Sequence, residues 1–599
     1  MWVFKFPNCI TETIDENGKI KKSINFEILK QMLSDDIIDG DEVYEFTWVG
    51  KKEAILEANK PTRKTLRPCL EKSVDWNSTE NLYIEGDNLE VLKLLQESYL
   101  NKVKMIYIDP PYNTGSDFIY NDDFKMNLSQ YAEEIGQYND EGDRLFKNTE
   151  GNGRFHSDWC SMMYSRLLVA RNLLSDDGVI FISIDENEQH NLSKICNEIF
   201  GESNNVGEIV RKTKSMTADK SSGFNLQHET LMIYAKNKSN LVLRGEPKSY
   251  GNYSNADNDP NGDWCSGDPS AKSGSSSTYF EIENPYTHRV DLPPLGRYWA
   301  FSKKTLERYI KEGKIKFKKD YREGERGFIF KRYKNDATSL YEPVHSLFAI
   351  DNQYMNQNAT IEVKRIFGAD VFSYPKPTSF VRKLVEYATN QDSIILDFFS
   401  GSATTAQAIL EQNAIDGGKR KFIMVQLPEL VEKSKGAFEK GYETICDIGR
   451  GRINLSSKEL NLLVDNGYRT FKIDDSNMND VYYAPSDYSQ GFLSQLESNI
   501  KPDRTDLDLL FGCLLEWGLP LSLPYSSEEI DGCTVHDYND GDLIACFDEN
   551  VPDSVVKAIA KKKPLRAVFR DSSFSDSPSK INVGEIFKLL APDTRVKVI

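Results

Sequence analysis

Short apolar runs alternate with longer amphipathic stretches along most of this chain. The runs are rich in Ile, Val or aromatic residues and are bounded by Gly, Asp or Pro, which predicts strands at Val103–Ile108, Val179–Ile184, Leu231–Ala235, Ile394–Phe398 and Phe422–Gln426. Apolar residues at helical spacing between these runs predict helices at Leu89–Tyr99, Trp159–Leu174 and Thr404–Asn413. Strands that alternate with helices favour an α/β fold with a parallel sheet.

Other parts of the chain depart from this alternation. Residues 1–79 are polar and mixed, and residues 456–599 have a mixed α/β pattern of their own. Near residue 240 the alternation is interrupted, first by a segment dense in Gly, Ser, Asn and Asp and then by a strongly basic segment. We therefore expect an N-terminal segment, one α/β domain in two parts, an insertion and a separate C-terminal α/β domain, at 1–79, 80–239 with 371–455, 240–370 and 456–599.

The composition limits the class of protein. The 599 residues are 39% hydrophobic and 11% aromatic, which excludes global disorder and a fibrous repeat. A net charge of −18 excludes a wholly basic nucleic-acid coat protein but not a local basic face. No apolar stretch reaches the roughly 18 residues of a membrane helix. The start of the chain, Met1–Ile10, is too mixed for a secretory signal.

Cysteine and histidine residues give no sign of a metal site or a disulfide framework. The 9 cysteines are scattered without a Cys-x-x-Cys pair, and the 6 histidines form no pair with metal-ligand spacing. A Gly-x4-Gly-Lys-Ser/Thr phosphate loop is also absent from the sequence, so we do not expect ATP hydrolysis. These features predict a soluble protein of a reducing compartment, the cytoplasm, with no metal.

The strongest chemical signal is Asp109-Pro110-Pro111-Tyr112, directly after the predicted strand Val103–Ile108. Two successive prolines fix the backbone and remove two N–H groups. The Asp109 carboxylate and the Pro110 carbonyl can together accept both hydrogens of one exocyclic amino group, and Tyr112 offers a face for a planar base. The alternative is an ordinary proline-rich turn, which the buried strand before it makes less favoured.

Two further turns have the residues of a ligand site. Asp397-Phe398-Phe399-Ser400-Gly401 joins a predicted strand to a predicted helix, and Gly401 would let the backbone approach a ligand closely. A single turn of this kind is as often a plain α/β connection. Asp87 stands at the start of the helix Leu89–Tyr99, where it is a helix cap, a ligand contact or both.

Together these segments resemble a known family, the S-adenosylmethionine-dependent amino DNA methyltransferases of the β class. The resemblance extends to the modification subunits of type III restriction–modification systems, and the segments that carry it are ENLYIEGDNLEVLKLL at Glu80–Leu95, GRYWAF at Gly296–Phe301, FIMVQLPE at Phe422–Glu429 and AVFRDSSF at Ala567–Phe574. It covers most of residues 45–599. It implies a Rossmann-like methyltransferase sheet with an inserted target-recognition domain, and methyl transfer from S-adenosylmethionine to N6 of adenine in double-stranded DNA.

The resemblance also assigns residues. It places a flipped target adenine on Asp109, Pro110, Pro111 and Tyr112, and it places the cofactor along a second set, Asp87, Lys376, Asp397, Phe399 and Gly401. Two positions depart from the family pattern. Ala403 replaces the second glycine of the usual Gly-x-Gly turn, and Gln426 replaces the acidic residue that normally holds the ribose hydroxyls. Glu429 could supply that charge instead.

The basic segment is the candidate DNA-reading surface. Between residues 286 and 335 there are 15 lysines and arginines against six acidic residues, a net charge of +9, and aromatic residues are interspersed. Basic side chains can neutralise phosphates, and our candidates are Arg289, Arg297, Lys303, Lys304, Lys318 and Lys319. The alternative is a solvated basic face without a ligand.

The resemblance implies partners as well. The C-terminal domain resembles the family's region for homodimer formation and for docking of an ATP-dependent restriction subunit. Two other functions stay open from the sequence. One is a solitary regulatory adenine methyltransferase, and the other is a DNA-recognition subunit that has lost catalysis, against which the intact Asp109–Tyr112 motif argues.

Overall fold

The computed structural model describes two compact units, residues 1–49 and 50–599. It covers residues 45–115, 153–215, 224–337, 339–431, 436–460, 465–479, 500–574 and 577–599, and the backbone of the short strands at 10–14, 20–24, 118–120 and 145–147. In the first unit, β1 (Ile10–Ile14) pairs antiparallel with β2 (Ile20–Ile24). In the second unit, β6 (Phe118–Tyr120) pairs antiparallel with β7 (Leu145–Lys147).

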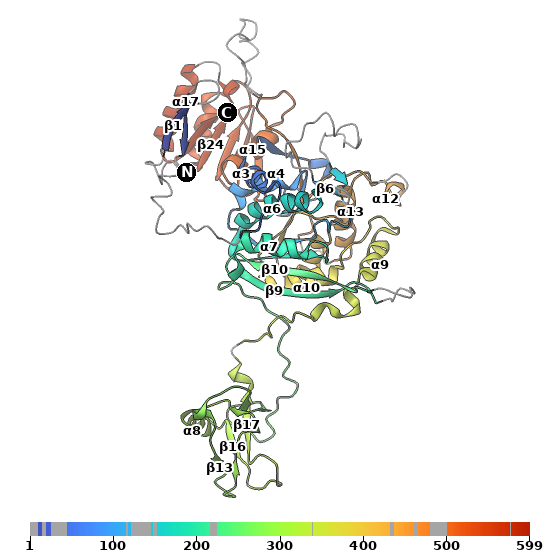
Figure 1. Cartoon of the computed structure of the whole chain (residues 1–599). Helices are drawn as coiled ribbons and strands as arrows, with labels where there is room; N and C mark the ends of the chain where they lie inside the picture. The colour runs from blue at the N-terminus through green and yellow to red at the C-terminus, as the bar shows by residue number, and fades with distance from the viewer. Residues whose placement is uncertain are drawn as a thin grey trace. The chain divides into compact units, whose positions relative to one another are not determined.

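A large mixed sheet forms the centre of the second unit (Figure 1). Within the described residues it has nine strands, in the order β3 (Lys64–Pro68), β20 (Arg469–Asp475), β4 (Leu82–Glu85), β19 (Lys421–Gln426), β18 (Ile394–Asp397), β5 (Val103–Ile108), β8 (Leu174–Ile184), β10 (His228–Ala235) and β9 (Asn205–Lys212). Neighbouring strands from β20 to β8 pair in parallel, and the pairs at the two edges are antiparallel. This sheet confirms the expected α/β fold class.

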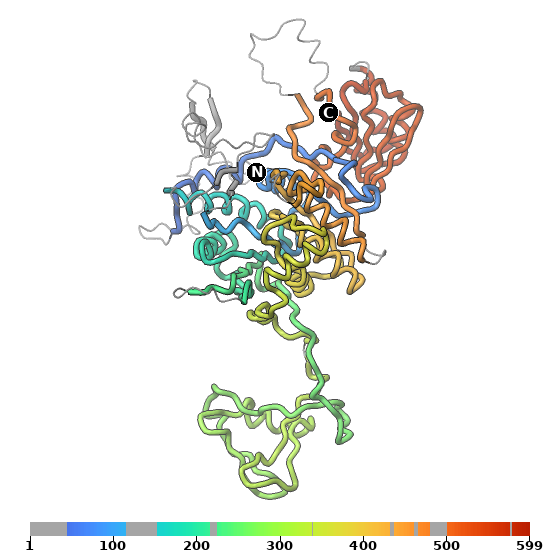
Figure 2. Tube along the Cα trace, turned by 90° about the vertical axis from the view of Figure 1, so that its right-hand side faces the viewer, coloured from blue at the N-terminus to red at the C-terminus, as the bar shows by residue number. Residues whose placement is uncertain are grey.

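Two groups of helices pack beside the sheet (Figure 2). One group contains α3 (Lys51–Asn59), α4 (Asn88–Tyr99), α6 (Phe155–Leu173), α7 (Gln189–Phe200) and α15 (Asp506–Glu516). The other contains α9 (Asn356–Phe367), α10 (Thr378–Ala388), α11 (Thr404–Asp416) and α13 (Ile445–Ser457), and α12 is the short helix Gly436–Glu439. Met105 and Tyr107 of β5 are buried in one core with Phe380 of α10 and Ile409 of α11. Burial on both faces explains why the central strands read as continuous apolar runs.

The register of the central strands determines where the site lies. Leu396 of β18 pairs with Ile106 of β5 on one side and with Ile423 of β19 on the other, all in parallel. The carboxyl ends of these strands therefore meet at one edge of the sheet. In open parallel sheets this edge is where ligands bind.

The predicted strands and helices are confirmed, but the sheet differs from the prediction in strand direction and in the number of strands. The strand expected at Leu231–Ala235 is β10, which is antiparallel to β8, so its expected parallel direction is wrong. Antiparallel neighbours need no crossover helix. The strands β3, β4, β9 and β20 were not predicted. β3 and β20 lie outside the expected boundaries at residues 80 and 455, so the sheet draws on more of the chain than the composition suggested.

The insertion is shorter than expected. Its two linkers pair with one another, where Gly245 N donates to Glu342 O at 3.0 Å and Lys248 N donates to Leu340 O at 2.9 Å. Beyond them, Val363 and Phe367 of α9 pack with Ala437 and Ile448 of the domain that carries the central sheet, because their apolar side chains complete a core there. The insertion therefore ends near residue 341 rather than 370.

In its described residues, small sheets and one α-helix make up most of the regular structure of the insertion. Its elements are β11 (Trp264–Gly267), β12 (Ser270–Ala271), β13 (Ile282–Glu283), β14 (Val290–Asp291), β15 (Tyr298–Trp299), α8 (Lys303–Lys311), β16 (Ile315–Phe317) and β17 (Phe328–Tyr333). Trp299, Phe301 and Phe328 form its aromatic core with Phe280 and Ile282. Part of the aromatic content of this segment thus serves folding.

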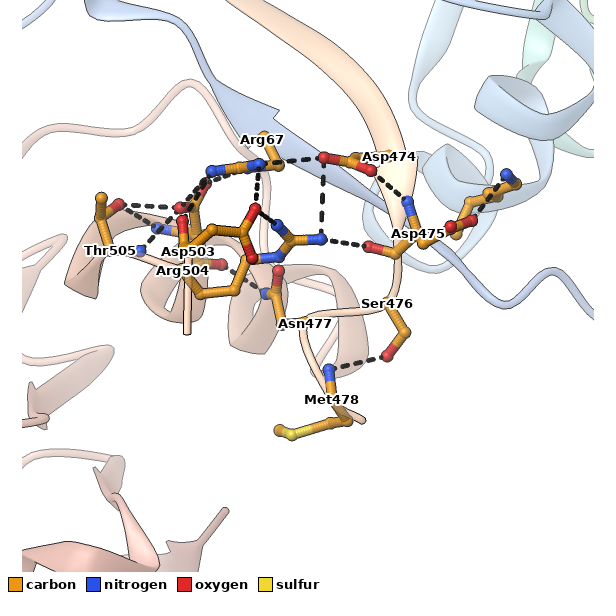
Figure 3. Close-up of polar contacts among 11 residues, drawn as sticks. Arg67, Asp474, Asp475, Ser476, Asn477, Met478, Asp503, Arg504 and Thr505 are labelled. Atoms are coloured by element: carbon orange, nitrogen blue, oxygen red, sulfur yellow. Dashed lines mark hydrogen bonds and ion pairs between the residues drawn. The ribbon is translucent and has the colours of Figure 1, made fainter. Parts of the chain in front are cut away.

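The C-terminal residues form a second, smaller sheet. Its strands are β21 (Tyr525–Ile530), β22 (Cys533–Tyr538), β23 (Leu543–Cys546), β24 (Arg566–Phe569) and β25 (Arg595–Val598), in that order, with α16 (Asp553–Lys561) and α17 (Ser577–Leu590). Figure 3 shows polar contacts between the central sheet, at Arg67 and Asp474, and the segment around Asp503, which precedes the smaller sheet. Arg67 of β3 donates to Asp474 of β20 at 3.0 Å and to Asp508 of α15 at 3.0 Å. Its guanidinium therefore ties three elements together, and the Asp508 hydrogen bond raises the Arg67 pKa.

No helix in the described part of the chain is both long and apolar enough to cross a membrane.

Candidate active site

The turn after β5 holds the predicted acceptor groups in place. β5 is buried along its whole length, and Asp109, Pro110 and Pro111 follow it at once. The Pro111 carbonyl accepts a hydrogen bond from Trp159 Nε1 at 2.8 Å, which fixes the turn from below. Asn113 ends the turn with a left-handed φ of 60°. Within the described residues no hydrogen bond is made to the Pro110 carbonyl, so it is available as an acceptor.

The Asp109 carboxylate already has partners. Lys376 Nζ lies 2.6 Å from both Asp109 oxygens, and the Tyr112 hydroxyl donates to Asp109 Oδ1 at 2.9 Å. The Lys376 ammonium also lies 4.9 Å from the centre of the Tyr112 ring. Lys376 is thus in contact with the predicted base-binding groups rather than only with the predicted cofactor groups.

A second carboxylate lies behind this contact. Glu229 of β10 is buried, accepts from Arg211 Nε of β9 at 2.8 Å, and accepts from the Tyr112 hydroxyl at 3.2 Å. Burial alone would raise the Glu229 pKa, but the charges of Lys376 and Arg211 outweigh it and lower the pKa. Burial, together with the charge of Asp109, raises the Tyr112 pKa well above its usual value. Tyr112 therefore keeps its proton, and Glu229 is charged.

The turn after β18 is organised by hydrogen bonds to Asp397. Asp397 Oδ1 accepts from Phe399 N at 3.0 Å and Oδ2 accepts from Thr405 Oγ1 at 2.5 Å, so one carboxyl group spans the whole turn. Gly401 N donates to Gln426 Oε1 at 2.7 Å. Burial raises the Asp397 pKa to about 7. The turn is therefore held by its own side chains and by β19.

Ala403 has a left-handed backbone, with φ 60° and ψ 37°, at the start of α11. This conformation is unfavourable for any residue with a Cβ atom. The fully buried Arg452 of α13 flanks it, because its Nη1 donates to Ser402 Oγ at 2.8 Å and to Thr404 Oγ1 at 2.6 Å. Burial lowers the Arg452 pKa to about 10. Arg452 thus fixes both neighbours of the strained residue.

One cavity of about 370 Å³ joins the two turns. Its lining includes most of the predicted site residues: Asp109, Pro110, Pro111, Lys376, Asp397, Phe399, Gly401, Gln426 and Glu429. Side chains from the ends of β5, β18 and β19, which are far apart in sequence, therefore meet around one space. The cavity is large enough to hold a sizeable organic ligand.

The comparisons with known proteins show the family to which the chain belongs. A family model described as DNA methylase matches residues 103–429. The chain is 31% identical to the EcoPI Mod subunit of a type III restriction–modification enzyme from Escherichia phage P1, over 96% of this chain and 93% of that protein. The chain belongs to the type III Mod subunits. It is a site-specific DNA methyltransferase that transfers the methyl group of S-adenosylmethionine to N6 of adenine, as the sequence predicted.

Two further matches can be compared with this methyltransferase. The EcoP15I Mod subunit of Escherichia coli is also 31% identical, over 98% of this chain and 94% of its own length. Among solved structures, the SAM complex of M1.HpyAVI aligns with 62% of this chain and 99% of its own at 12% identity, with a TM-score of 0.28.

The turn of the methyltransferase after β18 fits the methyl donor. Gly401 has a left-handed φ of 49°, and a Cβ atom there would lie 3.3 Å from the Phe372 ring, so both the backbone and the space favour glycine at this turn. Ser400 lines the cavity, and its buried hydroxyl has no hydrogen-bond partner within the described residues. An unpaired buried hydroxyl is costly unless a ligand satisfies it.

Three predicted cofactor residues differ in their surroundings. Asp87 caps α4 by accepting from Leu89 N at 2.9 Å, and it does not line the cavity, so the helix-cap reading describes its contacts. Gln426 lines the cavity but uses Oε1 to hold Gly401. Burial raises the Glu429 pKa to about 7. A contact of Gln426 or Glu429 with the ribose of the cofactor stays a prediction.

The predicted DNA-binding residues of the methyltransferase lie on the insertion. Arg289, Lys303 and Lys319 lie 5.5 to 5.7 Å from the ring centres of Tyr321, Phe280 and Tyr286, respectively. Lys304 is exposed on α8, and Lys318 Nζ lies 3.8 Å from Glu325. Arg297 instead donates to Asp268 at 3.0 Å and to the Ser270 carbonyl at 2.9 Å. Arg297 thus has a structural partner, and the other five present cations at or near the surface.

Glu229, Arg211 and Arg452 are the site residues that the sequence did not predict. Glu229 stands two residues before the predicted strand Leu231–Ala235, so a charged residue beside a buried run was the available signal. Arg211 lies on an unpredicted edge strand, and Arg452 lies in a helix after the cofactor segment. Their partners come from distant parts of the chain, which no local pattern shows.

Proposed function

We propose that this methyltransferase captures one adenine of a specific duplex sequence at the end of β5 and methylates it there. The observation that carries the proposal is the cavity that Asp109 and Pro110 line together with Phe399 and Gly401. Group transfer requires that the acceptor and the donor be held in contact and in line. A cavity lined from both strand ends meets this requirement.

The acceptor side binds the exocyclic amino group. Its two hydrogens go to an Asp109 oxygen and to the Pro110 carbonyl, which leaves the nitrogen lone pair directed at the cavity. Tyr112 supplies a ring for the base to stack on once the nucleotide has left the duplex, an event that costs a few kcal/mol. Neither acceptor needs to become covalently attached to the base.

The donor side consists of the turn after β18. S-adenosylmethionine supplies, when bound, a methyl group made electrophilic by its sulfonium. Asp397 spans the turn that faces it, Gly401 allows close approach, and Gln426 fixes the Gly401 amide at 2.7 Å. After transfer the amino nitrogen gives up one proton, and the adjacent Asp109 carboxylate is placed to accept it.

The insertion is the proposed reader of the duplex. Arg289, Lys303, Lys304, Lys318 and Lys319 offer cations for phosphates, and the neighbouring tyrosines offer stacking and hydrogen-bonding groups. We extend the proposal to assembly in the cytoplasm as a homodimer with a restriction subunit, because the relatives are named as Mod subunits of type III enzymes. The alternative for the assembly is a solitary enzyme without a restriction subunit.

Purified chain incubated with S-adenosylmethionine and unmethylated genomic DNA tests this proposal. Hydrolysis to nucleosides followed by mass spectrometry should give N6-methyladenine as the methylated product. N4-methylcytosine alone, or no product from folded chain that binds S-adenosylmethionine, would contradict it. Sedimentation of the same preparation should show a dimer, and a monomer would overturn that part.

A further inference from the structure

The proposed acceptor of the target amino group is occupied by another part of the chain. Lys376 Nζ lies 2.6 Å from both Asp109 oxygens, and the Tyr112 hydroxyl occupies Oδ1 as well. A carboxylate offers about four lone-pair positions, and charge-assisted hydrogen bonds are the strongest that it makes. An uncharged amino group would therefore compete poorly with the ammonium for Asp109.

Lys376 has to leave for a second reason. Methyl transfer places positive charge on the amino nitrogen until its proton departs. A lysine ammonium held on the same carboxylate would oppose that charge, and charge repulsion is strong where water is excluded. The Lys376 ammonium therefore stabilises the Asp109 carboxylate in the free enzyme but opposes methyl transfer, unless another anion binds the ammonium during the reaction.

Glu229 is the second anion within reach. Its Oε1 lies 3.9 Å from Lys376 Nζ, and the carboxylate is buried and held by Arg211. Arg211 stays fixed beside Glu229, because it is buried and donates to the Tyr354 carbonyl at 2.6 Å and to Asn356 Oδ1 at 2.7 Å. Among the described residues, the charged groups in direct contact in this cluster are Asp109, Glu229, Arg211 and Lys376, so two anions balance two cations.

We propose that Glu229 is a positioning residue that receives the Lys376 ammonium when the target amino group takes its place on Asp109. The exchange needs no new charge in the buried site, because Lys376 passes from one carboxylate to the other. The Tyr112 hydroxyl, which contacts both carboxylates, moves with it and frees Asp109 Oδ1. This inference rests on the proposed capture of adenine by Asp109.

Paired substitutions test the exchange on a duplex that carries the sequence methylated by the wild-type enzyme. Glu229→Gln keeps the side-chain volume and removes the charge, so Lys376 stays on Asp109. The rate constant for methyl transfer should then fall about tenfold or more, with an unchanged dissociation constant for S-adenosylmethionine. Adding Lys376→Met removes the ammonium, so the double variant should be faster than Glu229→Gln alone.

A recovery of this kind separates the proposal from loss of folding. Two losses of structure would add, whereas the exchange predicts that the second substitution repairs the first. Glu229→Asp, which keeps the charge, should retain more activity than Glu229→Gln. The matched control is the ion pair of Lys383 and Glu246, with an N–O distance of 2.7 Å, where neither Glu246→Gln nor its combination with Lys383→Met should alter the rate.

DNA binding gives a readout that does not depend on turnover. Glu229→Gln should weaken binding of the duplex, but not of a duplex with purine, which lacks the amino group, at the target position. An equal effect on both duplexes would overturn the proposal, as would additive losses in the double variant. A raised dissociation constant for S-adenosylmethionine in Lys376→Met, with Glu229→Gln like wild type, would assign Lys376 to the methyl donor instead. If the wild-type enzyme methylates no adenine, the proposed function itself fails.

Discussion

The two halves of the active site are built differently, although they lie at the ends of neighbouring strands. At the end of β18, the turn is held mainly by uncharged hydrogen bonds, such as Gly401 N to Gln426 Oε1 at 2.7 Å. At the end of β5, Asp109 is paired with the Lys376 ammonium, and Glu229 with Arg211. A methyl donor meets a turn that is already shaped, whereas an adenine has to exchange partners with the protein. The difference suggests that target selection occurs at the acceptor side.

The largest expected effect separates these halves. Asp109→Ala removes an acceptor of the amino group, and methyl transfer should fall by about 10²- to 10³-fold or more, as for other preorganised polar groups. The dissociation constant for S-adenosylmethionine should change little, because the turn after β18 has its own supports. Single-turnover transfer and calorimetric titration measure the two quantities. Normal turnover would show that Asp109 has no role in methyl transfer. Loss of cofactor binding would show that the two halves of the site do not act independently.

Arg452→Met should instead affect the cofactor side of the site. It leaves the buried Ser402 and Thr404 hydroxyls without their donor beside the left-handed Ala403, at a cost of about 1–3 kcal/mol. Cofactor affinity should then fall by about tenfold. Ala403→Gly relieves the backbone and should recover part of that affinity in the Arg452→Met background. Calorimetry on the single and double variants decides, and an unrescued loss would mean that Arg452 acts through global folding.

The pH dependence of cofactor binding tests the electrostatics of the donor side. Asp397 has a pKa of about 7, above its usual range because it is buried. Its negative charge therefore appears as the pH rises through about 7, and affinity for the sulfonium cation should rise with it. Affinity for S-adenosylhomocysteine, whose sulfur is neutral, should rise less.

Asp397→Asn is the control for this effect, since it should remove the difference between the two ligands. The same ionisation has the opposite sign for folding. Because the folded pKa is raised, its contribution to stability is present at low pH and is lost as the pH rises through about 7. If the ratio of the wild-type affinities for S-adenosylmethionine and S-adenosylhomocysteine does not change between pH 6 and 8, the charge of Asp397 does not act on the sulfonium.

The smallest expected effect concerns the insertion. Arg289→Ala or Lys319→Ala should each lower the slope of log binding constant against log salt by about 0.9, if each contacts one phosphate. Lys316→Ala is the matched control, because Lys316 Nζ is paired with Asp257 at 2.6 Å. Filter binding over a salt series gives these slopes. Equal slopes for all variants would favour a basic face that does not contact DNA.

The sequence could predict residues that line this cavity because their signals are local. Asp109–Tyr112 follows a buried strand, and Asp397–Gly401 lies between a strand and a helix, so neighbouring residues reveal both. Lys376 was predicted as a cofactor residue, but its ammonium lies on Asp109. Glu229 and Arg452 depend on partners from other elements, and only the packing of β10 and α13 reveals them.

Two strands on one side of the sheet, β3 and β20, were harder to predict for a similar reason. β3 and β20 are partly exposed and polar, so they lack the apolar run that marked β5 and β18. β20 pairs with β4 and β3 pairs with β20, and Arg67 of β3 adds contacts to Asp474 and Asp508. Long-range ion pairs of this kind leave no periodic pattern in the sequence.

Mapping of modified bases tests the central claim most directly. The chain and its Asp109→Ala variant are each expressed in a host without DNA methylation, and the genomic DNA is sequenced with detection of methylated bases. We predict N6-methyladenine at one short sequence in the wild-type sample and none in the variant. Methylation that persists in the variant, or that falls on cytosine, would contradict the account.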